Sequence, residues 1–108
     1  MEFEVQKLEL ANGNIPFDEW YFAIADTKTR AVIGSRLTRV RGGNLGDHKS
    51  VGGGVSELRI DFGPGFRVYF GRRGRQVIVL LGGGDKRSQA RDIKTAQELW
   101  RRYGDETP

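Results

Sequence analysis

A set of basic side chains and one tyrosine has the residue types that bind a phosphate and move a proton. Arg59, Arg67 and Tyr69 occupy alternate positions on two short stretches, so they share one face of a predicted strand pair. Lys49 lies on the preceding strand and Lys86 at the end of the following one. The planar guanidinium group of arginine can bind phosphate with two parallel hydrogen bonds, and lysine supplies a compact positive charge. Tyrosine supplies an aromatic ring for stacking and a phenolic hydroxyl.

These groups are sufficient to cleave RNA without a metal. In that reaction a 2′-hydroxyl attacks the adjacent phosphate, a base takes its proton, and cations hold the charge that develops on the phosphoryl oxygens. An acid then protonates the leaving 5′-oxygen. The plainer alternative is that Arg59 and Arg67 only solvate the open face of a sheet.

The stretch that positions these residues is ELRIDFGPGFRVYF, from Glu57 to Phe70. Apolar and polar residues alternate on both sides of a Gly-Pro-Gly turn, which is typical of a β-hairpin. One face is predicted to point into the core and carries six apolar residues, namely Leu58, Ile60, Phe62, Phe66, Val68 and Phe70. The other face is predicted to carry the chemistry.

The composition limits the classes of protein that the chain can represent. With 108 residues, 37% of them hydrophobic, we expect one domain over residues 1–108. There is no cysteine and one histidine, so disulfides and a conventional zinc centre are not expected, and no cofactor is predicted. Neither a signal peptide nor a membrane-spanning run is recognisable, which predicts a cytoplasmic protein without membrane contact.

The formal net charge of +4 hides a strong asymmetry along the chain. Residues 1–27 hold one lysine and six acids, whereas residues 28–103 hold seventeen Lys and Arg and six acids, an excess of eleven positive charges. Such a field attracts polyanions such as nucleic acid, although a basic surface kept for solubility gives the same count.

The remaining periodicity predicts a small α+β domain of the order β-α-α-β-β-β-(α), with helices on one side of a mainly antiparallel sheet. An irregular strand is expected over residues 3–10, a helix from Pro16 and a second helix from Asp26 or Thr27 to Arg41. Arg36 is placed on the outside or the edge of that second helix. The glycine-rich residues 42–54 predict a loop with a short strand near 48–51, and QVIVLL (76–81) a strand covered on both faces and ended by GGGDK. A last helix runs from Asp85 or Ser88 to about Tyr103.

Other chemistries find less support in the sequence. No glycine cluster has the spacing of a nucleotide-binding loop. Glu57 and Asp61 flank Arg59, which favours ion pairs that orient the arginine over a catalytic pair of carboxylates. His48 lies in a glycine-rich loop, where a histidine is more often an exposed polar residue. The alternative is that His48 has a catalytic role or binds the substrate.

Three spaced motifs resemble a known family: GNLGDHK (43–49), ELR…GPGFRVYF (57–70) and LLGGGDKRSQARDIKTAQELW (80–100), preceded by FDEW and RLTRV. The chain is similar over these motifs to the RelE/ParE toxin superfamily, in its HigB-like addiction-module killer branch. The resemblance implies the toxin of a type II toxin–antitoxin pair, which cuts mRNA on the ribosome and is silenced by a helix-turn-helix antitoxin.

Carried over by position, the resemblance assigns a catalytic or phosphate-holding role to Arg59, Arg67 and Lys86. Lys49, on the strand before the hairpin, is added to the catalytic set because of its position. Substrate binding is expected from His48, Tyr69, Arg87, Gln89 and Arg91, on the hairpin face and at the start of the last helix. The family's usual tyrosine after the basic position has no counterpart, because Arg91 and Asp92 stand there. Tyr69, His48, Asp92 or the lysines are therefore the alternatives for proton transfer.

Three functions remain to be compared. The preferred hypothesis is a ribosome-dependent endoribonuclease whose partners are ribosome, mRNA and antitoxin. The first alternative is a ParE-like toxin that inhibits DNA gyrase by binding it, without nuclease activity, because the fold alone does not specify the function. The second alternative is a nucleic-acid-binding module without catalysis, which would bind RNA in a salt-sensitive way and release no cut products.

Overall fold

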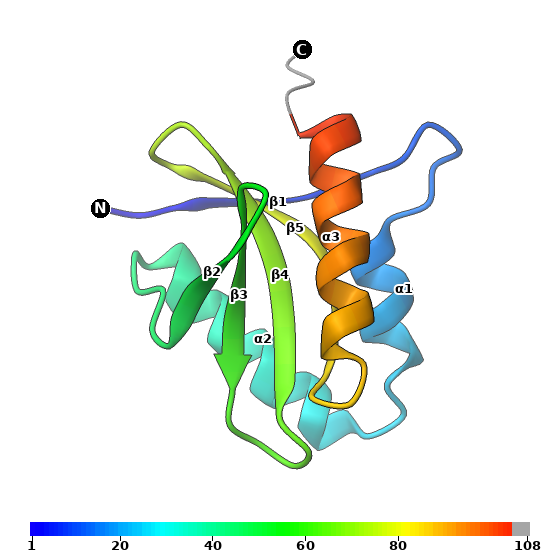
Figure 1. Cartoon of the computed structure of the whole chain (residues 1–108). Helices are drawn as coiled ribbons and strands as arrows, with labels where there is room; N and C mark the ends of the chain where they lie inside the picture. Colours follow the sequence, from blue (N-terminus) through cyan, green and yellow to red (C-terminus); the bar gives the residue numbers. More distant parts are fainter. Residues whose placement is uncertain (105–108) are drawn as a thin grey trace.

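The computed structural model describes residues 1–104, so residues 105–108 of the predicted domain lie outside the described part. Within residues 1–104, three helices and five strands follow one another, with four strands rather than the predicted three between the second and the last helix (Figure 1). Their bounds are β1 Glu4–Lys7, α1 Pro16–Ala23, α2 Thr27–Arg41, β2 His48–Gly52, β3 Val55–Ile60, β4 Phe66–Arg73, β5 Val77–Asp85 and α3 Gln89–Tyr103. The predicted α+β class is confirmed. Within residues 1–104, no helix has the length and apolar content needed to cross a lipid bilayer.

The five strands form one mixed sheet in the order β1-β5-β4-β3-β2. β1 runs parallel to β5, and the other neighbours are antiparallel, as the hairpin pattern predicts. β1 holds only four residues, so the strand expected over residues 3–10 was predicted too long. Leu8 and Leu10 still pack into the core beyond the end of this strand.

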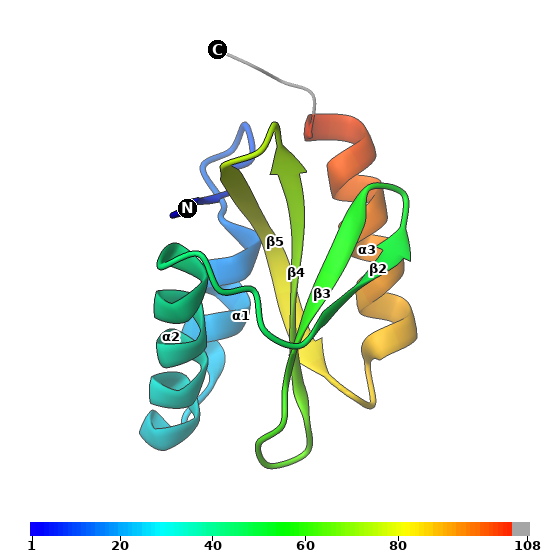
Figure 2. The same cartoon turned by 90° about the vertical axis from the view of Figure 1, so that its left-hand side faces the viewer.

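Helices cover both faces of the sheet, and the prediction that they lie on one side is wrong. Figure 2 shows α2 on one side of the sheet and α3 on the other. The first core cluster joins α1 and α2 to residues such as Leu58 and Val68, whereas the second joins α3 to Val55 and Tyr69. The reason is that successive side chains of β5 are apolar and point to opposite faces of the sheet, so both faces must be covered. Ile78 enters the first cluster, and its neighbour Val79 enters the second.

The helix starts follow the predicted signals. Pro16 occupies the first turn of α1, where its missing N–H costs no hydrogen bond. Asp26 caps α2 by accepting a hydrogen bond from the backbone N–H of Lys28 at 3.2 Å. Arg36, however, is only 7% exposed, so its predicted position on the outside or the edge of α2 is wrong.

β5 continues through the glycines that were expected to end it. Its last four residues, Gly82 to Asp85, still pair with β4. A side chain at Gly83 would collide with the Trp20 ring of α1, and one at Gly84 with the Asp92 carboxylate of α3. These glycines therefore allow α1 and α3 to approach the strand closely.

Candidate functional site

The register of the strands confirms which side chains share the second face of the hairpin. Lys49 pairs with Glu57, and Glu57 in turn pairs with Tyr69 across β3 and β4. Arg59 pairs directly with Arg67. Because paired residues point to the same side of a sheet, all five lie on the face that α3 partly covers.

Three cations predicted to act together line one hollow of about 340 Å³ at the Gly-Pro-Gly end of the hairpin. We call it the basic pocket; its lining residues are Asp47, Arg59, Ile60, Asp61, Gly63, Pro64, Gly65, Arg67 and Lys86. Gly63 and Gly65 have positive φ values of 56° and 86°, which the turn requires. The backbone N–H of Lys86 donates to the carbonyl of Gly65 at 3.0 Å, and this bond seats Lys86 beside the turn.

A fully buried carboxylate lies next to the two arginines of this pocket. Glu57 is 0% exposed, and its Oε1 accepts a hydrogen bond from Nε of Arg59 at 3.3 Å. Its Oε2 is 3.9 Å from Nε of Arg67. Nη1 of Arg67 donates to the carbonyl of Gly65 at 3.5 Å. Nη2 of Arg67 and the two outer nitrogens of Arg59 are left for a ligand. The predicted pairing of Glu57 with Arg59 is confirmed, but nothing in the sequence signals the complete burial of the carboxylate.

Gln89 supports this carboxylate from the first turn of α3. Its side-chain amide donates to both oxygens of Glu57, at 3.2 and 3.3 Å. The structure therefore places Gln89 behind the arginines, where it holds their counter-ion, rather than in the lining of the basic pocket. Sequence reasoning could not find this contact, because 32 positions separate the two residues.

Tyr69 shares the face of the arginines but is not open to solvent. It is 1% exposed and belongs to the core cluster beneath α3, so its ring is unavailable for stacking on a nucleotide in this structure. Its hydroxyl makes no hydrogen bond to any part of residues 1–104. Burial, followed by the negative charges of Glu57 and Asp92, raises the pKa of the Tyr69 phenol well above its ordinary value. Donation of this proton at neutral pH is correspondingly disfavoured.

His48 and Lys49 point to opposite faces of β2, although both were expected near the substrate. His48 pairs with Leu58, whose side chain enters the first core cluster, and its Nδ1 lies 2.9 Å from the carbonyl oxygen of Gly46. Lys49 is exposed on the same face of the sheet as Glu57, but it does not line the basic pocket. The structure thus separates His48 from the cations of the pocket and leaves Lys49 on the same sheet face as them.

Arg87 and Arg91 line a different hollow at the start of α3, of about 760 Å³. Nη2 of Arg87 is 3.3 Å from Oδ2 of Asp85, and Nε of Arg91 is 3.9 Å from Oδ1 of Asp92. Both arginines therefore face carboxylates of their own loop or helix. The structure does not bring them together with the basic pocket.

Asp47 and Asp61 on the rim of the basic pocket extend the set of proton acceptors found from the sequence. The backbone carbonyl of Asp47 also accepts hydrogen bonds from the N–H of Arg59 at 2.9 Å and from Nη2 of Arg36 at 2.9 Å. Within residues 1–104, no three His, Cys, Asp or Glu side chains are grouped so that they could hold a metal ion. The arrangement can bind one phosphate on its cations and accept a proton on a nearby carboxylate.

The fold and the site together define a small α+β protein with a cationic pocket at one end of a sheet that helices cover on both faces. No known protein-family model matches the chain. A protein of Haemophilus influenzae (strain Rd), described only as uncharacterized, is 42% identical to this chain over 90 residues. The match covers 83% of this chain and 91% of that protein, so the chain belongs to the same family as the Haemophilus influenzae protein.

Proposed function

We propose that this protein is a RelE/ParE-type toxin of the HigB-like branch, which cleaves mRNA on the ribosome and is held inactive by a cognate helix-turn-helix antitoxin. The observation that carries the proposal is that Arg59, Arg67 and Lys86 line one pocket, whose volume of about 340 Å³ lies in the range of small-molecule binding sites. Two of the three motifs that resemble the family, at 57–70 and 80–100, supply these residues. The α+β class and the β-α-α order at the start of the chain also support the proposal.

The proposed reaction is an internal transfer of the phosphoryl group. The 2′-oxygen of a nucleotide attacks its own 3′-phosphate, the bond to the 5′-oxygen breaks, and the products are a 2′,3′-cyclic phosphate and a 5′-hydroxyl. Arg59 and Arg67 hold the phosphoryl oxygens as negative charge develops on them. The ammonium group of Lys86 is suited to protonate the leaving 5′-oxygen.

Removal of the 2′-proton requires a group that can accept it. Guanidinium groups keep their protons in proteins, so Arg59 suits charge neutralisation rather than base catalysis. Lys49 is one of the lysines predicted as alternatives for proton transfer, and the lining of the basic pocket adds the carboxylates of Asp47 and Asp61. Asp47→Asn and Asp61→Asn would each slow cleavage without weakening RNA binding if that carboxylate is the base.

The decisive experiment incubates the purified protein with ribosomes programmed with a defined mRNA and maps the 5′ ends that appear. We expect new ends in the decoding site with the wild-type protein, and a loss of cleavage of at least a hundredfold in Arg67→Ala and Lys86→Ala. Arg75→Ala is the matched control, because this exposed arginine lies in the β4–β5 turn, at the opposite end of the sheet from the basic pocket (Figure 1). Intact mRNA in the presence of folded wild-type protein would refute the proposal.

Two further outcomes discriminate the alternatives. Growth arrest that survives Arg67→Ala and Lys86→Ala, together with inhibited supercoiling by gyrase, would favour the ParE-like function. Salt-sensitive RNA binding with no cut products would favour a binding module. A small helix-turn-helix protein encoded next to this chain would support the toxin–antitoxin assignment but would not identify the target.

A further inference from the structure

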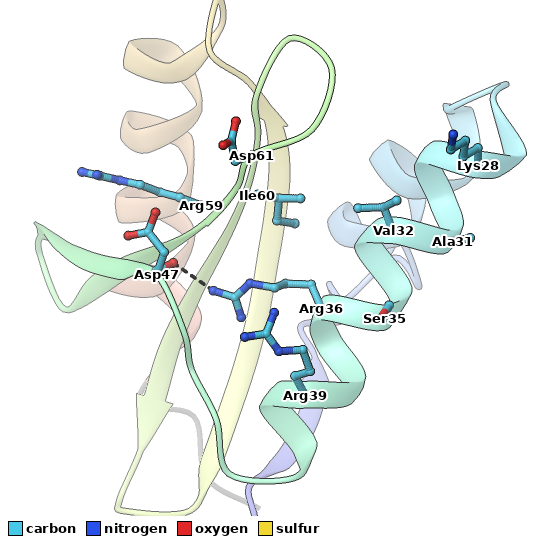
Figure 3. A pocket seen from close by; sticks show the side chains of 10 residues that line it. All are labelled: Lys28, Ala31, Val32, Ser35, Arg36, Arg39, Asp47, Arg59, Ile60 and Asp61. Atoms are coloured by element: carbon cyan, nitrogen blue, oxygen red, sulfur yellow. Dashed lines mark hydrogen bonds between the residues drawn. The ribbon is translucent and has the colours of Figure 1, made fainter.

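Another hollow, of about 530 Å³, opens between α2 and the β2–β3 side of the sheet (Figure 3). We call it the α2 groove; it is lined by Lys28, Ala31, Val32, Ser35, Arg36, Arg39, Asp47, Arg59, Ile60 and Asp61. Four of these residues, Asp47, Arg59, Ile60 and Asp61, also line the basic pocket. The two hollows are therefore neighbours that share one wall.

The strongest feature of the α2 groove is a buried guanidinium that is only partly satisfied. Arg36 is 7% exposed, and Figure 3 shows its Nη2 bonded to the Asp47 carbonyl. Its Nη1 is buried and finds no hydrogen-bond partner within residues 1–104. A buried charged donor left without a partner is costly, so an anionic oxygen at Nη1 would stabilise this arrangement.

The backbone fixes Arg36 in this position. Gly46 has a φ of +62°, and a Cβ added there would lie 2.7 to 3.0 Å from the guanidinium atoms of Arg36. The glycine thus lets the loop before β2 lie directly against the guanidinium. Burial, followed by the neighbouring charge of Arg39, lowers the pKa of Arg36, and the negative charge of Asp47 acts in the opposite direction.

Arg39 lies next to Arg36 on α2, Lys28 lines the groove further along the same helix, and an apolar surface lies between them (Figure 3). Within residues 1–104, neither Lys28, Arg36 nor Arg39 has a carboxylate within ion-pair distance. Val32 and Ile60 provide apolar contacts in the same groove. A ligand that fits both features carries an anion next to a flat, weakly polar group, as a nucleotide does.

We propose that the α2 groove binds the nucleotide adjacent to the one in the basic pocket, with its phosphate on Arg36 and Arg39 and its base against Val32 and Ile60. Arg59, which lines both hollows, then lies between two successive nucleotides of one RNA strand. This inference rests on RNA as the substrate class of the proposed function. It adds a second binding position, which would determine which nucleotides flank the cleaved bond.

The test uses a fluorescein-labelled 2′-O-methyl tetrauridylate, in which the blocked 2′-oxygen prevents cleavage, so binding is measured by itself. Fluorescence anisotropy should give about tenfold weaker binding for Arg39→Ala and for Arg36→Met than for wild type at low salt. The slope of log affinity against log salt should fall by about 0.7 for each cation removed. Arg75→Ala should keep at least two thirds of the wild-type affinity at the salt concentration used for the comparison.

Arg39→Ala carries the test if Arg36→Met fails to fold, because Arg39 is exposed. A second readout is the Nε–Hε resonance of Arg36 in the wild-type protein, which should shift when the tetrauridylate is added. Unchanged affinity and salt slope in Arg39→Ala would overturn the inference. It would also be overturned if a hexaglutamate peptide, and not the tetrauridylate, shifted the Arg36 resonance, because the groove would then suit an acidic protein segment.

The outcomes separate this inference from the proposed function. Tetrauridylate binding that depends on Arg39, combined with intact mRNA on ribosomes, would support the second nucleotide position and refute the nuclease. Cleavage on ribosomes, combined with tetrauridylate binding that is unchanged in Arg39→Ala, would support the nuclease and refute the second nucleotide position.

Discussion

Replacing Glu57 by glutamine tests whether the buried carboxylate holds the two arginines of the basic pocket. The substitution keeps the shape of the side chain and one acceptor oxygen but removes the negative charge. Arg67, whose side chain is 14% exposed, would then lose the only carboxylate that lies within 4.0 Å of it in residues 1–104. Arg59 would lose its partner too, but its side chain is 36% exposed and can regain water.

The expected loss of stability follows from these exposures. Removing one partner of a fully buried ion pair costs about 3 to 5 kcal/mol, and a hydrogen bond to a charged group contributes about 1.5 to 3 kcal/mol. Solvent reaches Arg59, and the Arg67 contact is long at 3.9 Å, so both contributions must be discounted. We expect the free energy of unfolding to fall by about 2 to 3 kcal/mol, which lowers Tm by about 10 °C in a domain of this size.

Urea denaturation followed by circular dichroism measures this loss, and Glu98→Gln is the matched control. Glu98 also pairs with an arginine, Arg101, at 2.6 Å, but this pair lies on the exposed surface of α3. The control should therefore unfold at the same urea concentration as wild type within experimental error. Unlike this pair, the Glu57 network connects α3 to the hairpin through Gln89.

A double variant isolates the unpaired charge as the cause. Glu57→Gln combined with Arg67→Met removes the arginine that would otherwise stay buried without its counter-ion, so it should be more stable than Glu57→Gln alone. If Glu57→Gln unfolds at the same urea concentration as Glu98→Gln, the buried carboxylate does not stabilise the arginines and the reasoning is refuted.

Three other substitutions test separate parts of the fold. Tyr69→Phe removes a buried hydroxyl without a partner, so urea denaturation should show stability equal to or up to about 1 kcal/mol above wild type, and a clear loss would contradict the burial described above. Gly83→Ala forces a methyl group against the Trp20 ring, and we expect a loss of about 1 to 3 kcal/mol, which an unchanged urea midpoint would rule out. Asp26→Ala removes the cap of α2. Hydrogen bonds from Thr29 and, to a smaller extent, Lys28 lower the pKa of Asp26 in the folded protein. The stabilisation that the cap gives should therefore be present above the ordinary pKa of 3.8 and disappear as pH falls through the lower pKa of the folded state. Urea midpoints of wild type and Asp26→Ala should therefore differ at pH 7 and converge towards pH 2, and a constant gap would argue against the cap.

Local patterns in the sequence determined the elements that carry the site. The period-two alternation around the Gly-Pro-Gly turn predicted the hairpin and the common face of Arg59, Arg67 and Tyr69, and the register confirms both. The helix starts at Pro16 and Asp26 were also readable, because capping and first-turn preferences depend on neighbouring residues. Lys86 was correctly placed near the end of the strand that follows the hairpin.

Only the tertiary structure decided which of these residues can reach a ligand. The position of α3 over the second face buries Tyr69, and the close approach of Gly46 to Arg36 turns an apparently external arginine into a buried cation. Gln89 reaches Glu57 across 32 positions of the chain. Periodicity states that a side chain points to one face of an element, but it does not state what covers that face. What covers a face depends on contacts between segments that lie far apart in the sequence. These contacts decide which side chains are buried and which charges are left without a partner.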